Sequence, residues 1–205
     1  KYDTIGTDLL SACANDILVM GAKPLTFLDY IANEKLHPAI VEEMVTGMVK
    51  GCRETGVALV GGETAEMPDT YLKGEHDLVG VITGVVEKNK IITGEKIQPG
   101  DIVVGLPSNG LHTNGYSLAR KVFFDIGNYS VNDEITGLSK SIGLTLLEPH
   151  INYTKHIFAL LNSNISIKGI AHITGGGLLE NIPRILPDGL NVIINKKSWP
   201  SLPVF

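Results

Sequence analysis

Apolar and polar positions in the first part of the chain predict helices and strands in succession. Residues 7–20 are apolar almost all round a helix, which predicts a buried helix ending before Gly21. A second helix is predicted between Pro38 and Gly56, because its apolar positions repeat at helical spacing. Short apolar runs predict strands at 27–32, 57–60 and 78–86. This alternation predicts a mixed α/β (α+β) fold.

A polar stretch in the middle of the chain predicts a boundary between two domains. It contains Gly94 and Pro99, which favour a linker over a continuous element. We therefore expect a first domain over residues 1–87, a linker over 88–99 and a second domain over 100–205. The elements predicted in the second domain are strands at 102–106 and 169–174 and helices at 116–126, 138–147 and 151–161.

Composition and charge narrow the class of protein. The 205 residues carry a formal net charge of −5, so the chain lacks the basic excess that nucleic-acid binding needs. No apolar run is long enough to span a bilayer, and the first residues do not resemble a signal peptide. Cys13 and Cys52 fall inside helical patterns, which is typical of buried thiols in a reducing compartment. We expect a cytoplasmic protein without nucleic-acid or membrane partners.

Three consecutive glycines, Gly175, Gly176 and Gly177, follow the apolar run 169–174. Without Cβ atoms, the backbone can turn successive N–H groups toward one anion. The same residues fit a tight turn equally well. Pro183 excludes a long helix directly after them, and Asn181 could cap a new turn there. A bound anion would then be held by the glycines themselves.

Two carboxylates stand out in the first half. Glu63 follows the predicted strand 57–60 through two glycines, which places it where open α/β sheets bind ligands. Asp16 shares a helical face with Leu9, Cys13 and Met20, where a carboxylate is costly unless it pairs or binds a cation. Together they match the oxygen ligands of Mg²⁺. A solvated Glu63, and an Asp16 paired with a lysine or a backbone group, are the alternatives.

Two histidines accompany the predicted loops. His112 and Asn114 lie in a segment rich in Gly and Asn between a predicted strand and a predicted helix, a common place for ligand contacts. His172 lies just before the glycine triplet. A solvated role remains the alternative for each histidine, because a lone loop histidine is more often solvated than catalytic.

Several segments together resemble one family. They occur in the same order as in that family, at residues 3–6, 15–17, 61–68, 110–118 and 172–184. The sequence resembles phosphoribosylformylglycinamidine cyclo-ligase, the aminoimidazole ribonucleotide synthetase of purine biosynthesis. The resemblance runs through the whole chain, and its most specific parts are the stretches GGETAEMP and HITGGGLLENIPR.

The resemblance implies a two-domain synthetase fold, here truncated at both ends, with ATP and Mg²⁺ as cofactors. The reaction implied is the ATP-dependent cyclisation of formylglycinamidine ribonucleotide to 5-aminoimidazole ribonucleotide. The first domain would bind ATP and form a homodimer by joining sheets, and the second would bind the substrate. The alternatives are another enzyme of the superfamily (the amidotransferase of the preceding purine step, selenophosphate synthetase or thiamine-phosphate kinase) or a non-catalytic fragment that binds nucleotide or dimerises.

The resemblance also assigns roles to single residues. ATP binding falls to Asn15, Asp16, Gly62 and Glu63, of which Asp16 and Glu63 would ligate Mg²⁺ and count as catalytic. His112 would be catalytic, and the residues assigned to the substrate and its phosphate are Asn114, His172, Gly175, Gly176 and Gly177. The chain departs from the family pattern at residues 149–153, where Pro-His-Ile-Asn-Tyr replaces Pro-Thr-Arg (or Lys)-Ile-Tyr.

Overall fold

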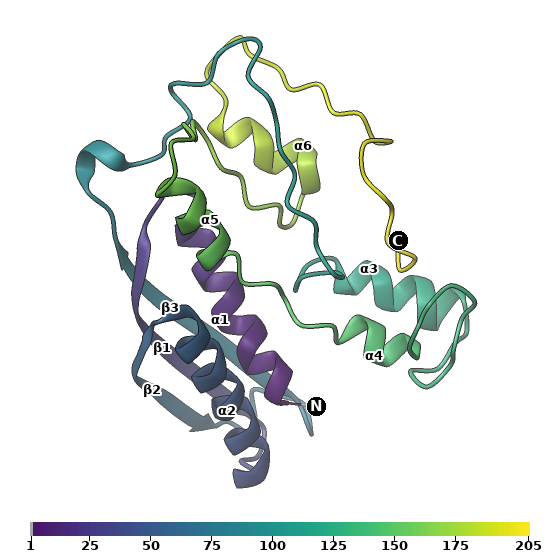
Figure 1. Cartoon of the computed structure of the whole chain (residues 1–205). Coiled ribbons are helices and arrows are strands. Elements are labelled where there is room, and N and C mark those ends of the chain that lie inside the picture. Colours follow the sequence, from purple (N-terminus) through teal and green to yellow (C-terminus); the bar gives the residue numbers. More distant parts are fainter. Residues whose placement is uncertain (1) are drawn as a thin grey trace. The chain divides into compact units, whose positions relative to one another are not determined.

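The computed structural model describes residues 2–205, which fall into two compact units (Figure 1). The first unit extends to Ile92 and also includes residues 152–167. The second comprises Thr93–Ile151 and Lys168–Phe205. The sequence predicts that the polar stretch 88–99 separates the two domains and that all of residues 100–205 belong to the second domain. Residues 152–167 instead cluster with the first unit.

The first unit contains most of the regular structure. Its elements are α1 (Asp3–Leu18), β1 (Lys23–Asn33), α2 (Pro38–Thr55), β2 (Ala58–Glu66), β3 (His76–Val85), the short 3₁₀ helix η1 (Lys88–Lys90) and α5 (Thr154–Leu161). The predicted helices and strands are all present here. α2 begins with Pro38 in its first turn and ends at Gly56, whose left-handed φ of 76° closes the helix as the sequence predicts.

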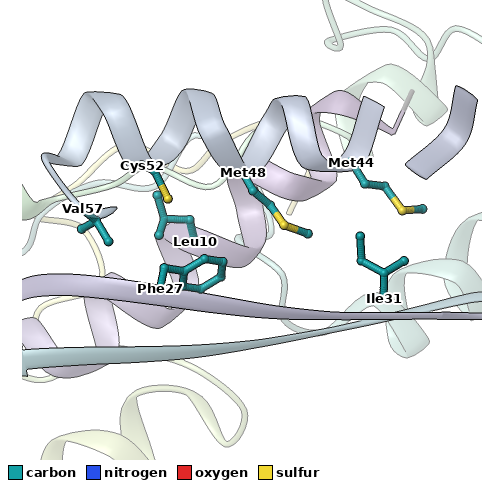
Figure 2. Close-up of a cluster of buried hydrophobic side chains, with 7 residues drawn as sticks. All are labelled: Leu10, Phe27, Ile31, Met44, Met48, Cys52 and Val57. Atoms are coloured by element: carbon teal, nitrogen blue, oxygen red, sulfur yellow. The ribbon is translucent and has the colours of Figure 1, made fainter. Parts of the chain in front are cut away.

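The three strands form one sheet in the order β2-β1-β3. β1 pairs with β2 in parallel and with β3 in antiparallel fashion. α1 and α2 cover one face of this sheet (Figure 1). Figure 2 shows the buried cluster between the helices and this face, made of Leu10, Phe27, Ile31, Met44, Met48, Cys52 and Val57. The apolar spacing of α2 thus supplies one side of the core.

The other face of the sheet carries apolar side chains that remain exposed. Because side chains alternate along a strand, Leu28 and Tyr30 point away from the face of Phe27 and Ile31. Leu28 pairs with Val81 and Tyr30 with Val79, so these residues share one side. We call this side, with Leu28, Tyr30, Val79 and Val81, the open face.

Helices α1 and α2 approach each other so closely that their backbones are in contact. A Cβ on Gly47 of α2 would lie 1.8 Å from the carbonyl oxygen of Asp3, whereas one on Gly51 would meet only the side chain of Leu10, at 2.7 Å. Gly47→Ala is therefore expected to lower the free energy of unfolding by about 3 kcal/mol, and Gly51→Ala by about 1 kcal/mol or less. Urea denaturation of both variants checks this. Equal losses would show that the helices can separate to admit a methyl group.

The second unit has short helices and long irregular stretches. Its elements are α3 (Tyr116–Arg120), the π-helix η2 (Lys121–Ile126), α4 (Ile142–Leu146), α6 (Gly177–Asn181) and the 3₁₀ helix η3 (Ile182–Ile185). The helix predicted at 116–126 is confirmed as the pair α3 and η2. The helix predicted at 138–147 is shorter, because the Ser141 side chain accepts the N–H of Leu144 and caps its start.

The two strands predicted in the second unit are wrong. Residues 102–106 and 169–174 are irregular in the structure. A strand requires a hydrogen-bonded neighbour, and neither segment is paired with another described segment. Ile102 keeps 88% of its surface exposed. An apolar run indicates a tendency to extend, but only pairing makes it a strand.

Candidate functional site

The glycine triplet forms a tight loop. Gly176 and Gly177 have left-handed φ angles of 87° and 62°, which residues with a Cβ rarely adopt. The N–H of Gly177 donates to the carbonyl of Thr174 at 3.0 Å and closes a turn. α6 ends after five residues, and Pro183 lies in the first turn of η3. The tight-turn alternative is confirmed, and phosphate binding remains a prediction.

One carboxylate packs against this loop. A Cβ built on Gly176 would lie 2.2 Å from Oε2 of Glu180, so the Glu180 side chain occupies the space beside Gly176. Its negative charge would repel an anion at close range. Glu180 is exposed, however, and its side chain can rotate into solvent. A phosphate on that side of Gly176 would therefore require Glu180 to turn away.

The structure brings the two predicted histidines together around a third. The ring of His112 stacks on that of His150 with centroids 4.3 Å apart, and the ring of His172 lies 5.7 Å from that of His150. His112 and Thr113 both have left-handed φ angles, 51° and 59°. Non-glycine residues rarely adopt this conformation, and it occurs often at functional sites. His150 is not among the site residues predicted from the sequence, although it lies in the segment that departs from the family pattern.

Hydrogen bonds fix the position of the His112 ring. Its Nε2 lies 2.5 Å from Oδ1 of Asn109, whose Nδ2 donates to the carbonyl of Pro149 at 2.9 Å. The side chain of Asn114 donates to the carbonyl of His112 at 2.8 Å. Asn114, predicted to contact the substrate, thus bonds the backbone of its own loop.

Burial keeps the two stacked rings neutral. Burial, with the nearby His172, lowers the pKa of His112 to about 4. Burial, with His112 and His172, lowers the pKa of His150 to about 3. Both imidazoles are uncharged at pH 7, so His112 suits hydrogen bonding to a ligand better than uptake of a full proton.

Acid is expected to destabilise the second unit through these rings. In the unfolded chain a histidine titrates near about 6.5, above its folded pKa, so the unfolded state binds more protons as the pH falls below that value. The free energy of unfolding should therefore be highest above pH ~6.5 and drop by up to about 1.4 kcal/mol per pH unit for each ring between pH ~6.5 and its folded pKa. Urea unfolding at pH 7 and pH 5, followed by the fluorescence of the single Trp, measures this.

His150→Phe should weaken that pH dependence, because phenylalanine retains the stacking but cannot titrate. His37 is exposed on the first unit, so His37→Gln serves as the matched control and should leave the dependence unchanged. A pH dependence in His150→Phe equal to that of the wild type would contradict the assignment.

The residues predicted to bind ATP lie in different environments. Asn15 is buried, and its Oδ1 accepts the N–H of Tyr153 at 3.0 Å, which anchors the start of α5. Asp16 is exposed, so the apolar face that it was predicted to share with Leu9, Cys13 and Met20 does not bury its side chain. Cys13 on that face is partly buried against the core of the first unit, whereas Met20 is 48% exposed. The fully buried side of α1 includes Leu10, Ala14 and Leu18.

Glu63 also differs from its prediction. β2 continues through Gly61 and Gly62 to Glu66, so Glu63 lies within the strand and not beyond its end. It pairs with Tyr30 and therefore projects from the open face. Its Oε1 accepts the N–H of Thr64 at 3.1 Å.

Gly62 lies beside Asp29, a carboxyl group that is not among the residues predicted for the site. It pairs with Asp29 on the helix-covered face, and a Cβ on Gly62 would approach Oδ1 of Asp29 to 2.4 Å. Burial raises the pKa of Asp29. The glycine thus makes room for a half-buried acid, which is a structural reason for its presence in the GGETAEMP motif.

Within one chain, Asp16 and Glu63 do not form a common cation site. Asp16 belongs to α1, which packs on the face of Phe27 and Ile31, whereas Glu63 projects from the open face. Among residues 2–205, no group of three or more His, Cys, Asp or Glu side chains could hold a metal ion. The prediction that one Mg²⁺ is shared by these two carboxylates of a single chain is therefore not supported by the geometry.

The layered first unit and the loop-rich second unit define an α/β protein whose fold occurs in solved structures. Thiamine-monophosphate kinase from Stenotrophomonas maltophilia matches 90% of this chain and 54% of its own, with a TM-score of 0.61 and 19% identity. E. coli HypE matches 82% of this chain and 47% of its own, with a TM-score of 0.55 and 19% identity. At these identities the likeness concerns the fold alone.

The sequence places the chain in one family. Residues 1–86 match the N-terminal domain, and residues 98–205 the C-terminal domain, of AIR synthase related proteins, and the chain belongs to that family. It is 52% identical over 205 residues to phosphoribosylformylglycinamidine cyclo-ligase of Geotalea daltonii and 49% identical to that of Alkaliphilus metalliredigens. The whole chain is covered in both cases, and it spans 59% of the length of these relatives.

No helix among residues 2–205 combines the length and the apolar character needed to cross a membrane. Cys13 and Cys52 are free thiols.

Proposed function

We propose that the protein catalyses the ATP-dependent cyclisation of formylglycinamidine ribonucleotide to 5-aminoimidazole ribonucleotide. The observation that carries this proposal is the identity of 52% and 49% to two relatives named phosphoribosylformylglycinamidine cyclo-ligase, which extends over the whole chain. The matched length spans the glycine loop and the histidine cluster of the second unit.

In this reaction ATP phosphorylates the formyl oxygen of the substrate and ADP is released. The ribosyl nitrogen then attacks the activated carbon, and phosphate leaves. Such transfers depend on positioning and charge neutralisation more than on a covalent catalyst. We assign the substrate phosphate to Gly175–Gly177, with His172 nearby. His112, neutral and fixed by Asn109, would hydrogen-bond the reacting groups, and Asn114 would shape its loop.

For the nucleotide we propose the first unit, with ATP and Mg²⁺ as cofactors. Asp16 and Glu63 are exposed and able to reach a ligand, whereas Asn15 acts through the packing of α5. Because one chain does not bring the two carboxylates together, we propose that each contributes separately to the binding of ATP and Mg²⁺.

The test is direct. The whole protein is incubated with ATP, with and without formylglycinamidine ribonucleotide, and ADP and 5-aminoimidazole ribonucleotide are quantified. We expect ADP release that depends on the ribonucleotide and matches the cyclised product in amount. ATP turnover with thiamine monophosphate in place of the ribonucleotide would assign the protein to a kinase, and ATP binding without turnover would favour a non-catalytic role.

We further propose that a second copy of the chain covers the open face. Leu28, Val79 and Val81 are exposed apolar side chains on one side of a sheet, and a homodimer that joins sheets would bury them. Val81→Lys should convert the dimer into monomers in sedimentation analysis, because burying an unpaired ammonium is costly. Val103→Lys, at an exposed position in the second unit, is the control. If the wild-type protein sedimented as a monomer, the proposed homodimer would be contradicted.

The cytoplasm is the compartment we propose. Two free thiols in a chain of this size fit a reducing environment.

A further inference from the structure

One buried side chain lies inside the glycine loop. Asn181 is 3% exposed, and its Nδ2 donates to the carbonyl oxygens of Gly177 at 2.8 Å and of Gly175 at 3.1 Å. The same nitrogen lies 3.4 Å from the carbonyl oxygen of Thr174, and Oδ1 accepts the hydroxyl of Thr174 at 3.2 Å. A single amide therefore contacts the loop at both of its ends.

These contacts determine where the backbone donors point. In a trans peptide, the carbonyl of one residue and the N–H of the next point in opposite directions. The carbonyls of Thr174, Gly175 and Gly177 are directed at Asn181, and no cis peptide occurs among the described residues. The N–H groups that consequently point away from Asn181 are those of Gly175, Gly176 and Leu178.

The fourth N–H of the loop has another role. Gly177 donates its N–H to Thr174 and closes the turn. By contrast, no backbone hydrogen bond from the N–H of Gly175, Gly176 or Leu178 occurs in the part of the chain that the structure describes. The loop thus presents three donors on the side opposite the buried amide. Several backbone N–H groups on one side of a turn bind the oxygens of a phosphate group.

We infer that Asn181 is the positioning residue of the phosphate loop, holding three carbonyls inward so that three N–H groups face the phosphate of the ribonucleotide. This inference rests on the proposed function, which places the substrate phosphate at Gly175–Gly177. Asn181 does not itself contact the phosphate, and it acts only through the backbone.

The first test compares Asn181→Ala and Asn181→Asp with the wild-type protein. Both variants lose the donor, and the carboxylate of the second would face carbonyl oxygens. We expect the dissociation constant of ribose 5-phosphate, measured by calorimetry, to rise about tenfold to a hundredfold, as the loss of hydrogen bonds to a charged group predicts. The KM for the ribonucleotide should rise in parallel, with the KM for ATP and kcat changing about twofold or less.

Asn33→Ala is the matched control, because Asn33 is also a buried asparagine but lies in the first unit, where its Oδ1 contacts Nδ1 of His76. It should lose stability without any change in ribose 5-phosphate binding. Wild-type affinity in Asn181→Ala would overturn the role of Asn181. If Gly176→Val still weakened binding, the phosphate site itself would stand.

The second test needs no variant. In ¹⁵N-labelled wild-type protein titrated with inorganic phosphate, we expect the amide resonances of Gly175, Gly176 and Leu178 to shift most and that of Gly177 to shift little. The largest shift at Gly177 would overturn the orientation that we derive for the loop. The absence of any shift in the loop, with no binding of ribose 5-phosphate, would overturn the phosphate site and the role of Asn181 together.

Discussion

Glu63→Gln is expected to lower ATP-dependent turnover about a hundredfold or more, because it removes a negative charge proposed to organise the metal-bound nucleotide. The same strand provides its control. Glu66 projects from the opposite face, pairs with Asn33, and accepts the N–H of Leu36 at 2.8 Å. Glu66→Gln should leave turnover close to that of the wild type. Steady-state kinetics of the whole protein compare the two, and equal losses would indicate general damage to β2.

A double variant tests whether the carboxylates of Asp16 and Glu63 act separately or on one metal ion. Asp16→Asn is also expected to reduce turnover strongly. Because Asp16 and Glu63 lie on opposite sides of the sheet within one chain, their effects on the activation free energy should add to within about 0.5 kcal/mol. If the double variant were no slower than the worse single variant, the two carboxylates would act on one ion, and the site would have to combine two copies.

Gly176→Val should raise the KM for the ribonucleotide about a hundredfold, with a much smaller effect on the KM for ATP. A valine would have to adopt the left-handed φ of 87°, where β-branched residues are strained by about 1–3 kcal/mol, and its Cβ would collide with Glu180. The loop would respond by turning its N–H groups away from the phosphate, which adds the loss of those hydrogen bonds.

Gly175 offers the control for that substitution. It has no left-handed φ, and a Cβ there would meet no atom within 4 Å. Gly175→Ala should therefore retain most of the affinity for the ribonucleotide. An equal rise of both KM values in Gly176→Val would point to misfolding and not to a phosphate site.

The first unit could be predicted from the sequence because its signals are local. The helical spacing of Met44, Met48 and Cys52 faces the core, and Gly56 ends the helix for a conformational reason that the sequence reveals. The end of β2 could not be predicted in the same way. Gly61 and Gly62 suggested a break, yet pairing with Leu28 and Asp29 carries the strand across both. Tertiary pairing prevailed over local preference.

Part of the candidate site depends on contacts that no local pattern encodes. His150 stacks on His112 from a loop far along the chain, and Asn181 reaches back to Thr174 from the next helix. The motifs indicated that these segments matter. Which side chain faces a ligand and which supports the backbone became evident only from the hydrogen bonds, as with Asn114, whose amide bonds its own loop.

The assignment of residues 152–167 to the first unit means that the chain crosses between the units three times. A single proteolytic cut in the stretch 88–99 would therefore not release two independent units. Residues 152–167, which contain α5, belong to the first unit but would remain covalently linked to the second. A fragment ending at Ile92 would lack Tyr153, whose N–H donates to Asn15, and would expose the side of α1 that carries Asn15. Adding a peptide of residues 152–167 should restore its stability, which makes complementation in trans a practical route to studying the first unit.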